Sequence, residues 1–194
     1  MFKIISIISI LIICIVFIDR VYSASGIYTP EYSVVSKTNN IEIRMYEKIK
    51  LISTIETQPY KQATYSGFRT LANYIFGNNK DNIEIPMTAP VITSSPDEIK
   101  IEISFVVNKK YDLETLPEPN TKKITFKEIE LGRVAVISFG LWATPKRIKN
   151  NITKLEKYLL ENSIQHSSEF LVAQYNSPWV MPPFRKNEIL VSID

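Results

Sequence analysis

The same order of predicted elements, strand, helix, strand and strand, occurs twice along this chain of 194 residues. Alternating apolar and polar residues indicate strands, and apolar residues three and four positions apart indicate amphipathic helices. A sheet with one apolar face has to bury that face against another layer. The repeat therefore predicts an α+β fold in which two half-sheets close on each other, with a helix packed over each. The first copy covers about residues 41–108 and the second about 133–194.

Both helices have recognisable ends. The first is expected over residues 60–76, because Pro59 precedes it and Gly77-Asn78-Asn79 follow it. The second has Thr144 as a suitable N-cap with Pro145 at its first position, and it is expected to end near Asn162. The predicted apolar stripes are Ala63, Phe68, Leu71, Ala72, Ile75 and Phe76 on the first helix and Ile148, Ile152, Leu155 and Leu159 on the second.

The strand patterns include two unusual places. Pro86 and Pro90 fall within the strand predicted over residues 83–95, and Pro178 has the equivalent place in the second copy. Because proline has no N–H for a sheet ladder, these residues predict edges, bulges or strand ends. Gly132 separates two strand patterns and predicts a hairpin there. The strands are expected over residues 31–35, 41–57, 83–95, 100–108, 124–131, 133–142, 169–175 and 188–193, with a loop over 109–121.

The N-terminal residues are typical of an export signal. Lys3 precedes an apolar run over residues 4–18, which is short for a transmembrane helix but fits a signal-peptide core. We therefore predict a signal peptide over residues 1–23, a linker over 24–31 and one domain over 32–194. The expected location is periplasmic or extracellular. The alternative is an uncleaved anchor formed by residues 4–18, which would place the protein on a membrane.

The composition argues against several classes of function. Lysines and glutamates are interspersed and the net charge is only +3, so there is no basic stripe of the kind that binds nucleic acid. His166 is the single histidine, and Cys14, in the predicted signal, is the single cysteine. A catalytic triad would have to use His166, and the sequence around it has no nucleophile-elbow pattern, so a triad is disfavoured. The three or four nitrogen or sulfur ligands of a zinc site are missing. We predict a binding protein with no catalytic residues and no protein metal site.

Two segments carry a resemblance to a known family. They are Met87-Thr88-Ala89-Pro90-Val91 and the late stretch from Gln174 to Ile189, which contains YNSPW, PPF and RKNE. Both resemble the SOUL heme-binding protein family, in which MTAPV and YNxPW…PPF…RNE segments recur. The resemblance extends over about residues 32–194. It implies a distorted, mostly antiparallel β-barrel with two helices, built from pseudo-duplicated βαββ units.

The resemblance also implies a ligand class, which is non-covalent heme or a related tetrapyrrole held in an apolar groove beside the first helix. The residues that this places near the ligand are Phe68, Leu71, Ala72, Ile75, Met87 and Trp179, with Arg69 as the preferred cation for a propionate and Lys61 and Lys80 as further candidates. The alternative interpretation is that the helical stripe is simply core and that the cations are solvated.

Iron ligation is a separate question. Some family members have a histidine between an arginine and a tyrosine in the early strand, where this chain has Arg44-Met45-Tyr46. Met45 and His166 are therefore the candidate axial ligands, and both are disfavoured. Met45 is expected to pack in the core, since it alternates with Ile41 and Ile43, and His166 is expected to be exposed. Apolar capture with weak or no ligation is the prediction.

Taken with the residues, the resemblance predicts an exported carrier or buffer of heme that is not an enzyme. Its expected partner is the tetrapyrrole itself, with membrane contact only if the N-terminal segment stays attached. A second interpretation is a module of the same fold that binds a non-heme small ligand or a protein partner. A third is an enzyme that modifies or hydrolyses tetrapyrroles, which the missing nucleophile and base disfavour.

Overall fold

The computed structural model describes residues 26–177 and 179–194, and the predicted signal peptide and Pro178 lie outside these described residues. Residues 26–31, which belong to the predicted linker, have no regular structure. In order, the elements are β1 (Tyr32–Thr38), β2 (Ile41–Glu56), α2 (Tyr60–Ile75), β3 (Val91–Ser94), β4 (Ile101–Val107), η1 (Leu113–Thr115), β5 (Thr125–Phe139), α3 (Pro145–Glu161), β6 (His166–Gln174), η2 (Pro182–Phe184) and β7 (Asn187–Ile193).

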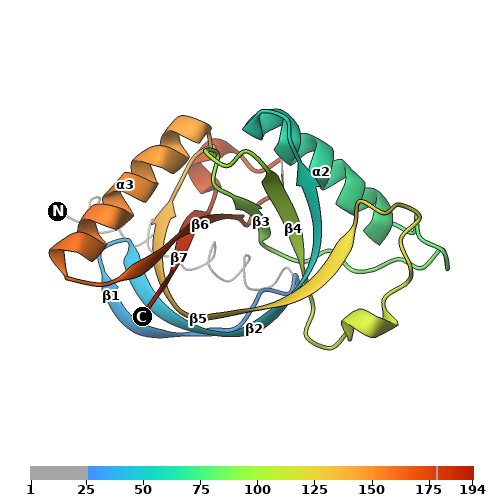
Figure 1. The fold of residues 1–194 in the computed structure, drawn as a ribbon, viewed down its shortest axis with the longest axis horizontal. Helices are drawn as coiled ribbons and strands as arrows, with labels where there is room; N and C mark the ends of the chain where they lie inside the picture. The colour runs from blue at the N-terminus through green and yellow to red at the C-terminus, as the bar shows by residue number, and fades with distance from the viewer. Residues whose placement is uncertain (1–25, 178) are drawn as a thin grey trace, which may run out of the picture.

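Six of the strands close into an antiparallel barrel (Figure 1). Its order is β2-β4-β3-β6-β7-β5, and β5 pairs with β2 to complete the ring, from Ile41 opposite Ile137 to Ser53 opposite Thr125. β1 pairs with the other side of β2. The predicted duplication is confirmed, because β2-α2-β3-β4 and β5-α3-β6-β7 have the same order and the same pairing.

Two apolar layers hold the barrel together. The first contains the inward residues of both helices and the strand residues beneath them, such as Ala135, Ile189 and Val191. The second contains no helical residue and alternates with the first along the strands, with Val134 and Leu190 among its members. Since neighbouring strand residues face opposite sides of a sheet, this second layer fills the barrel and the first lies between the barrel and its helices. Figure 1 shows α2 and α3 on the outside of the barrel.

Both helices form where the sequence predicts them. Thr144 Oγ1 accepts a hydrogen bond from the backbone N–H of Arg147 at 3.3 Å, as expected of an N-cap. α2 approaches the sheet closely at Gly67, where an added Cβ would lie 2.6 Å from Cδ1 of Ile103. None of the helices in the described residues is both long and apolar enough to cross a membrane.

The prediction of a strand over residues 83–95 was wrong for most of its length, because β3 includes only residues 91–94. Residues 83–90 instead form an irregular segment that leads into β3 and is held by individual hydrogen bonds. Ile85 N–H donates to the carbonyl of Ile75 at 2.8 Å, and Ala89 N–H donates to that of Tyr28 at 2.9 Å. The prolines explain this, because neither Pro86 nor Pro90 has an N–H to donate to a ladder.

The predicted hairpin at Gly132 was also wrong. β5 is one continuous strand from Thr125 to Phe139, and Gly132 lies within it opposite Tyr46. Gly132 has φ of 58°, a conformation that glycine adopts without steric cost. The 16-residue strand β2 offers a continuous partner past this point, so the chain bends at Gly132 without reversing.

Candidate functional site

The structure divides the predicted ligand residues of α2 between its two faces. Leu71, Ala72 and Ile75 are buried in the layer between α2 and the sheet, and Leu71 is 0% exposed. Phe68 is half-buried and packs edge-to-face on Phe105, with ring centroids 5.3 Å apart. These four side chains therefore hold α2 on the barrel, as the core interpretation of the stripe expects.

The solvent face of α2 has a different arrangement. Lys61, Tyr65 and Arg69 are spaced by four residues, so they form one row along this face. The ring of Tyr65 is exposed, and the Arg69 guanidinium carbon lies 5.8 Å from its centroid. An open, shallow hollow of ≈ 650 Å³ lies at the start of this row. It is lined by Gln58, Lys61, Gln62, Tyr65 and Ser66.

Sequence reasoning named Lys61 and Arg69 but missed Tyr65. Tyr65 lies off the apolar stripe, and only its spacing of four from a cation on each side could have pointed to it. The remaining predicted residues are not among those that line the hollow. Met87 lies in the irregular segment before β3, Lys80 follows α2, and Trp179 is an exposed residue of the β6–β7 loop. The hollow therefore combines an aromatic ring with cations and amides, and it is less apolar than the predicted groove.

The candidate iron ligands are both at the surface. Met45 is 44% exposed, so the expectation that it packs in the core was wrong. It lies on β2 opposite Ser33 of the outer strand β1, where one side of the sheet faces solvent. His166 begins β6, and its Nδ1 lies 2.6 Å from the carbonyl oxygen of Ser167. Among the described residues, no group of three or more His, Cys, Asp or Glu side chains is placed to hold a metal ion.

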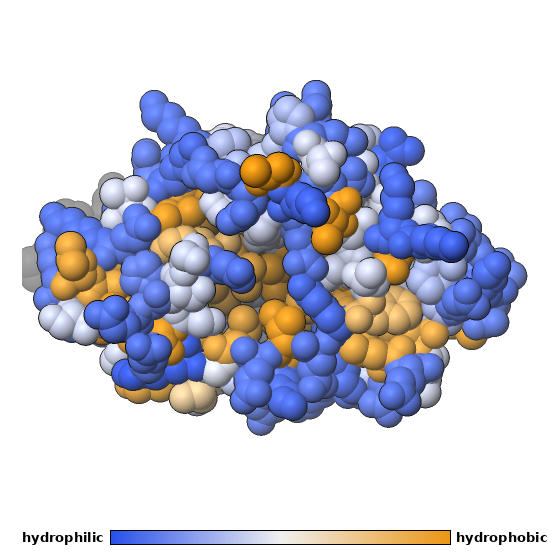
Figure 2. Space-filling model, in the orientation of Figure 1, coloured by the Kyte–Doolittle hydropathy of each residue, from blue (hydrophilic) through white to orange (hydrophobic). Residues whose placement is uncertain are grey.

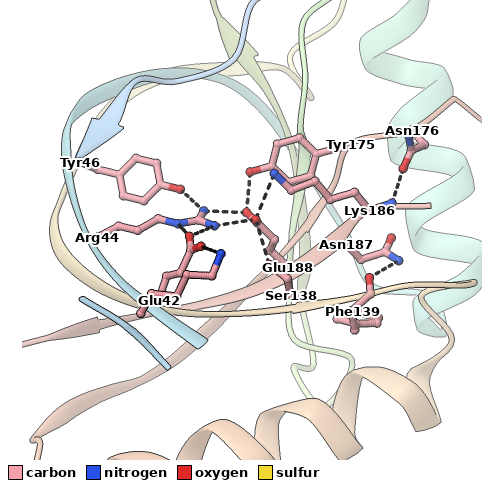
Figure 3. A network of polar contacts seen from close by, with 11 residues as sticks. Glu42, Arg44, Tyr46, Ser138, Phe139, Tyr175, Asn176, Lys186, Asn187 and Glu188 are labelled. Atoms are coloured by element: carbon pink, nitrogen blue, oxygen red, sulfur yellow. Dashed lines mark hydrogen bonds and ion pairs between the residues drawn. The ribbon is translucent and has the colours of Figure 1, made fainter. Parts of the chain in front are cut away.

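The most extensive polar cluster surrounds Glu188 on β7 (Figure 3). Its carboxylate is 0% exposed and accepts hydrogen bonds from Arg44 Nη1 at 3.0 Å and Nη2 at 2.8 Å. It also accepts from Tyr175 Oη at 2.6 Å and Ser138 Oγ at 3.3 Å, and Lys186 Nζ lies 3.2 Å away. A buried carboxylate needs such donors because its charge has been removed from water.

Arg44 on β2 is equally enclosed. Its Nε donates to Glu42 at 2.8 Å, its Nη1 also donates to Tyr46 Oη at 2.9 Å, and the ring of Tyr32 lies over it at 4.1 Å. Burial raises the pKa of Tyr46 to about 12, which keeps that phenol neutral. Because Arg44 and Glu188 satisfy each other within the barrel, this cluster is structural. No sequence pattern predicted this cluster, since Arg44 occupies a position of the alternating pattern that was expected to face solvent.

With this geometry described, comparisons with known proteins identify the family. The model of the SOUL heme-binding protein family matches residues 27–192, which is most of the chain. The chain belongs to the SOUL heme-binding protein family. Its sequence is 30% identical to Heme-binding protein 2 of Homo sapiens and 29% identical to that of Mus musculus. Each match spans 156 residues, 76% of this chain and 75% of the relative.

A solved structure shares the fold of this SOUL protein without close sequence similarity. It is the crystal structure of a hydrolase from Listeria innocua, which is 7% identical, with a TM-score of 0.58 over 82% of this chain and 94% of that one. At this identity the likeness concerns the fold alone.

The two segments that carry the family resemblance have clear structural roles in this SOUL protein. The late segment supplies Tyr175 and Glu188 to the buried cluster, and Asn187 Nδ2 donates to the carbonyl of Leu141 at 2.8 Å. In the early segment, the Thr88 hydroxyl donates to the carbonyl of Val106. The two segments therefore tie loops to the barrel.

The stability of the SOUL domain should depend on pH through Glu188. Burial raises the pKa of this carboxyl. Its hydrogen bonds to Arg44 and the nearby charge of Lys186 lower the pKa by more than burial raises it, so the pKa is below the ordinary 4.5. A carboxyl with a depressed folded pKa stabilises the native state above its unfolded pKa. That contribution is lost as the pH falls from about 4.5 through the folded value.

Urea unfolding at pH 7, 5, 4 and 3 measures this effect. The free energy of unfolding is expected to be level between pH 7 and 5 and to fall steeply below pH 4.5. Glu42 also has a lowered pKa, mainly through its hydrogen bond to Lys37, so Glu42→Gln serves as the control that removes the contribution of Glu42. Stability that stays constant down to pH 3 in both proteins would contradict the assignment.

Proposed function

We propose that this protein binds heme or a related tetrapyrrole non-covalently on the solvent face of α2 and serves as an exported carrier or buffer for it. Membership of the SOUL heme-binding family and the two relatives named Heme-binding protein 2 support the ligand class. The observation that supports the position is the row of Lys61, Tyr65 and Arg69 beside the hollow.

The spacing of this row suits a flat dianion. Four residues of α-helix rise about 6 Å, so Lys61 and Arg69 lie about 12 Å apart along the axis with Tyr65 between them. An exposed aromatic ring can stack against a macrocycle, and Lys and Arg pair with carboxylates such as propionates. Lys61, Tyr65 and Arg69 are therefore the residues that would hold the ligand, with Tyr65 against its face.

The proposed carrier or buffer role rests on how open the site is. A shallow hollow leaves most of a bound tetrapyrrole accessible, and this favours exchange over permanent retention. The apolar run at residues 4–18 supports the export part of the proposal.

A heme titration followed by visible absorption tests the proposal. The purified parent protein is expected to show a saturable one-to-one change in the Soret band. Reversing both cations, Lys61→Glu with Arg69→Glu, is expected to weaken binding roughly 10- to 100-fold, because two charge-assisted contacts are lost. The matched control is Lys154→Glu with Lys157→Glu, which makes the same charge change at exposed positions of α3.

Further arms test the other predicted residues. Met45→Ala is expected to leave the spectrum unchanged, and a loss of ligation bands in it would identify Met45 as an axial ligand. Met87→Ala and Trp179→Ala test the predicted walls of the groove. No saturable change in the parent protein would exclude the heme function. A gain in thermal stability with a different planar anion would then support the non-heme ligand module.

A further inference from the structure

Exposed apolar side chains gather on two loops at the start of α3. Leu141 and Trp142 belong to the loop between β5 and α3, and Trp179, Met181 and Phe184 belong to the loop between β6 and β7. All five are exposed, from 40% for Leu141 to 92% for Trp179. We call these five residues the loop platform. On the face shown in Figure 2, polar side chains form most of the periphery, and apolar side chains are visible mainly toward the middle.

The two loops brace each other. Leu141 N–H donates to the carbonyl of Pro182 at 3.1 Å, and the guanidinium of Arg185 lies 3.7 Å from the ring centroid of Trp142. Arg185 Nη2 also donates to the carbonyl of Ser177 at 3.1 Å, and Ser177 Oγ accepts from the N–H of Trp179 at 3.2 Å. These contacts hold the two loops together. The buried Arg185 connects them, because it stacks on Trp142 and donates to Ser177, which in turn accepts from the N–H of Trp179.

The charged residues within the two loops and the first turn of α3 are all basic: Lys146, Arg147, Arg185 and Lys186. The acidic residue that follows them, Glu188, is buried in the barrel and paired with Arg44. Lys146 and Lys186 are exposed beside the platform. Lys186 also lies 3.2 Å from the buried Glu188 carboxylate, whose charge Arg44 already balances. The next lysine of α3, Lys149, is already paired with Asp97 of the β3–β4 loop at 2.5 Å. The platform therefore combines exposed aromatic rings with a net positive rim, the complement of an anionic surface.

We propose that the loop platform docks onto an anionic lipid membrane. Tryptophan favours the membrane interface, where its ring lies among the headgroups, and lysines attract anionic lipids. Trp142, Trp179, Met181 and Phe184 supply apolar area, and Lys146 and Lys186 supply the charge. This contact is separate from the Lys61–Arg69 row and does not require a bound tetrapyrrole. It would bring a carrier to a surface into which tetrapyrroles partition.

Intrinsic fluorescence isolates the platform from the rest of the chain. The protein has two tryptophans, and both are platform residues, so their emission reports on the platform even where the apolar N-terminal segment also enters a bilayer. Vesicles of phosphatidylcholine with 30% phosphatidylglycerol are expected to shift the emission to the blue, and lipids brominated on the acyl chains are expected to quench it. Because each lysine near an anionic surface contributes about 1 kcal/mol, pure phosphatidylcholine should require at least about tenfold more lipid for the same response.

Matched variants test the two components. Lys146→Glu with Lys186→Gln is expected to raise the lipid requirement at least about tenfold, whereas Lys154→Glu with Lys157→Gln on the same helix should not. Trp179→Ala with Met181→Ala is expected to weaken quenching of the remaining Trp142, and Leu160→Ala, another highly exposed apolar residue, should not. Emission that anionic vesicles leave unchanged, or equal responses to both lipid mixtures, would overturn the proposal. An unchanged emission spectrum would favour a protein partner for the platform instead.

Discussion

Replacing Glu188 with alanine is expected to lower the free energy of unfolding by about 3–5 kcal/mol, because Arg44 would remain charged inside the barrel without its carboxylate. Arg44 is 2% exposed and Glu188 is 0% exposed, so water does not replace the lost partner. The free energy is measured by urea unfolding at pH 7. The control is Glu128→Ala, since Glu128 is exposed and lies 3.4 Å from Lys48; it should cost less than about 1 kcal/mol.

A double variant separates the cost of a stranded charge from the value of the pair. Arg44→Met with Glu188→Leu removes both charges and fills the space with apolar side chains. It is expected to be more stable than Glu188→Ala, because replacing a buried ion pair by apolar residues is often neutral or stabilising. If Glu188→Ala loses less than about 1 kcal/mol, the cluster is not the structural centre that its burial indicates.

Truncating Leu71 to alanine is expected to cost about 2–5 kcal/mol of stability, the usual range for a leucine removed from a packed core. Leu71 is 0% exposed and lies on the buried face of α2, opposite the proposed tetrapyrrole row. The folded variant should therefore bind heme as the parent does. Thermal or urea unfolding measures the stability. A heme titration at a temperature where the variant is folded measures the affinity.

Leu155→Ala on α3 is the matched comparison, because Leu155 is also 0% exposed and belongs to the same apolar layer. Both variants should lose similar stability and keep heme affinity. Loss of heme binding in Leu71→Ala alone, with little change in stability, would instead place Leu71 in the ligand wall, as the family resemblance implies. The comparison therefore decides between the two interpretations of the α2 stripe.

The proposed tetrapyrrole site was only partly predictable. Helical periodicity identified α2, because a pattern with a period of 3.6 residues is local information. The family resemblance then pointed to Lys61 and Arg69 as candidate cations. Periodicity did not show that Leu71, Ala72 and Ile75 pack against the sheet while Phe76, at the end of the stripe, is 61% exposed. A stripe that meets a ligand and one that meets a sheet have the same spacing. Tyr65 was missed because it lies on the polar face, which the search for an apolar stripe did not consider.

The sequence by itself determined the order of the elements, the duplication and the helix ends, because periodicity, Pro145 and the Thr144 cap act between near neighbours. Only the tertiary structure decided that β5 continues through Gly132, since its long partner β2 favours pairing over a turn. Only the tertiary structure joined Arg44 to Glu188, which are 144 residues apart in the chain. Closure of the barrel brings their strands together through pairings that no local pattern encodes. Because both side chains are buried, each charge needs the other to compensate for its lost hydration.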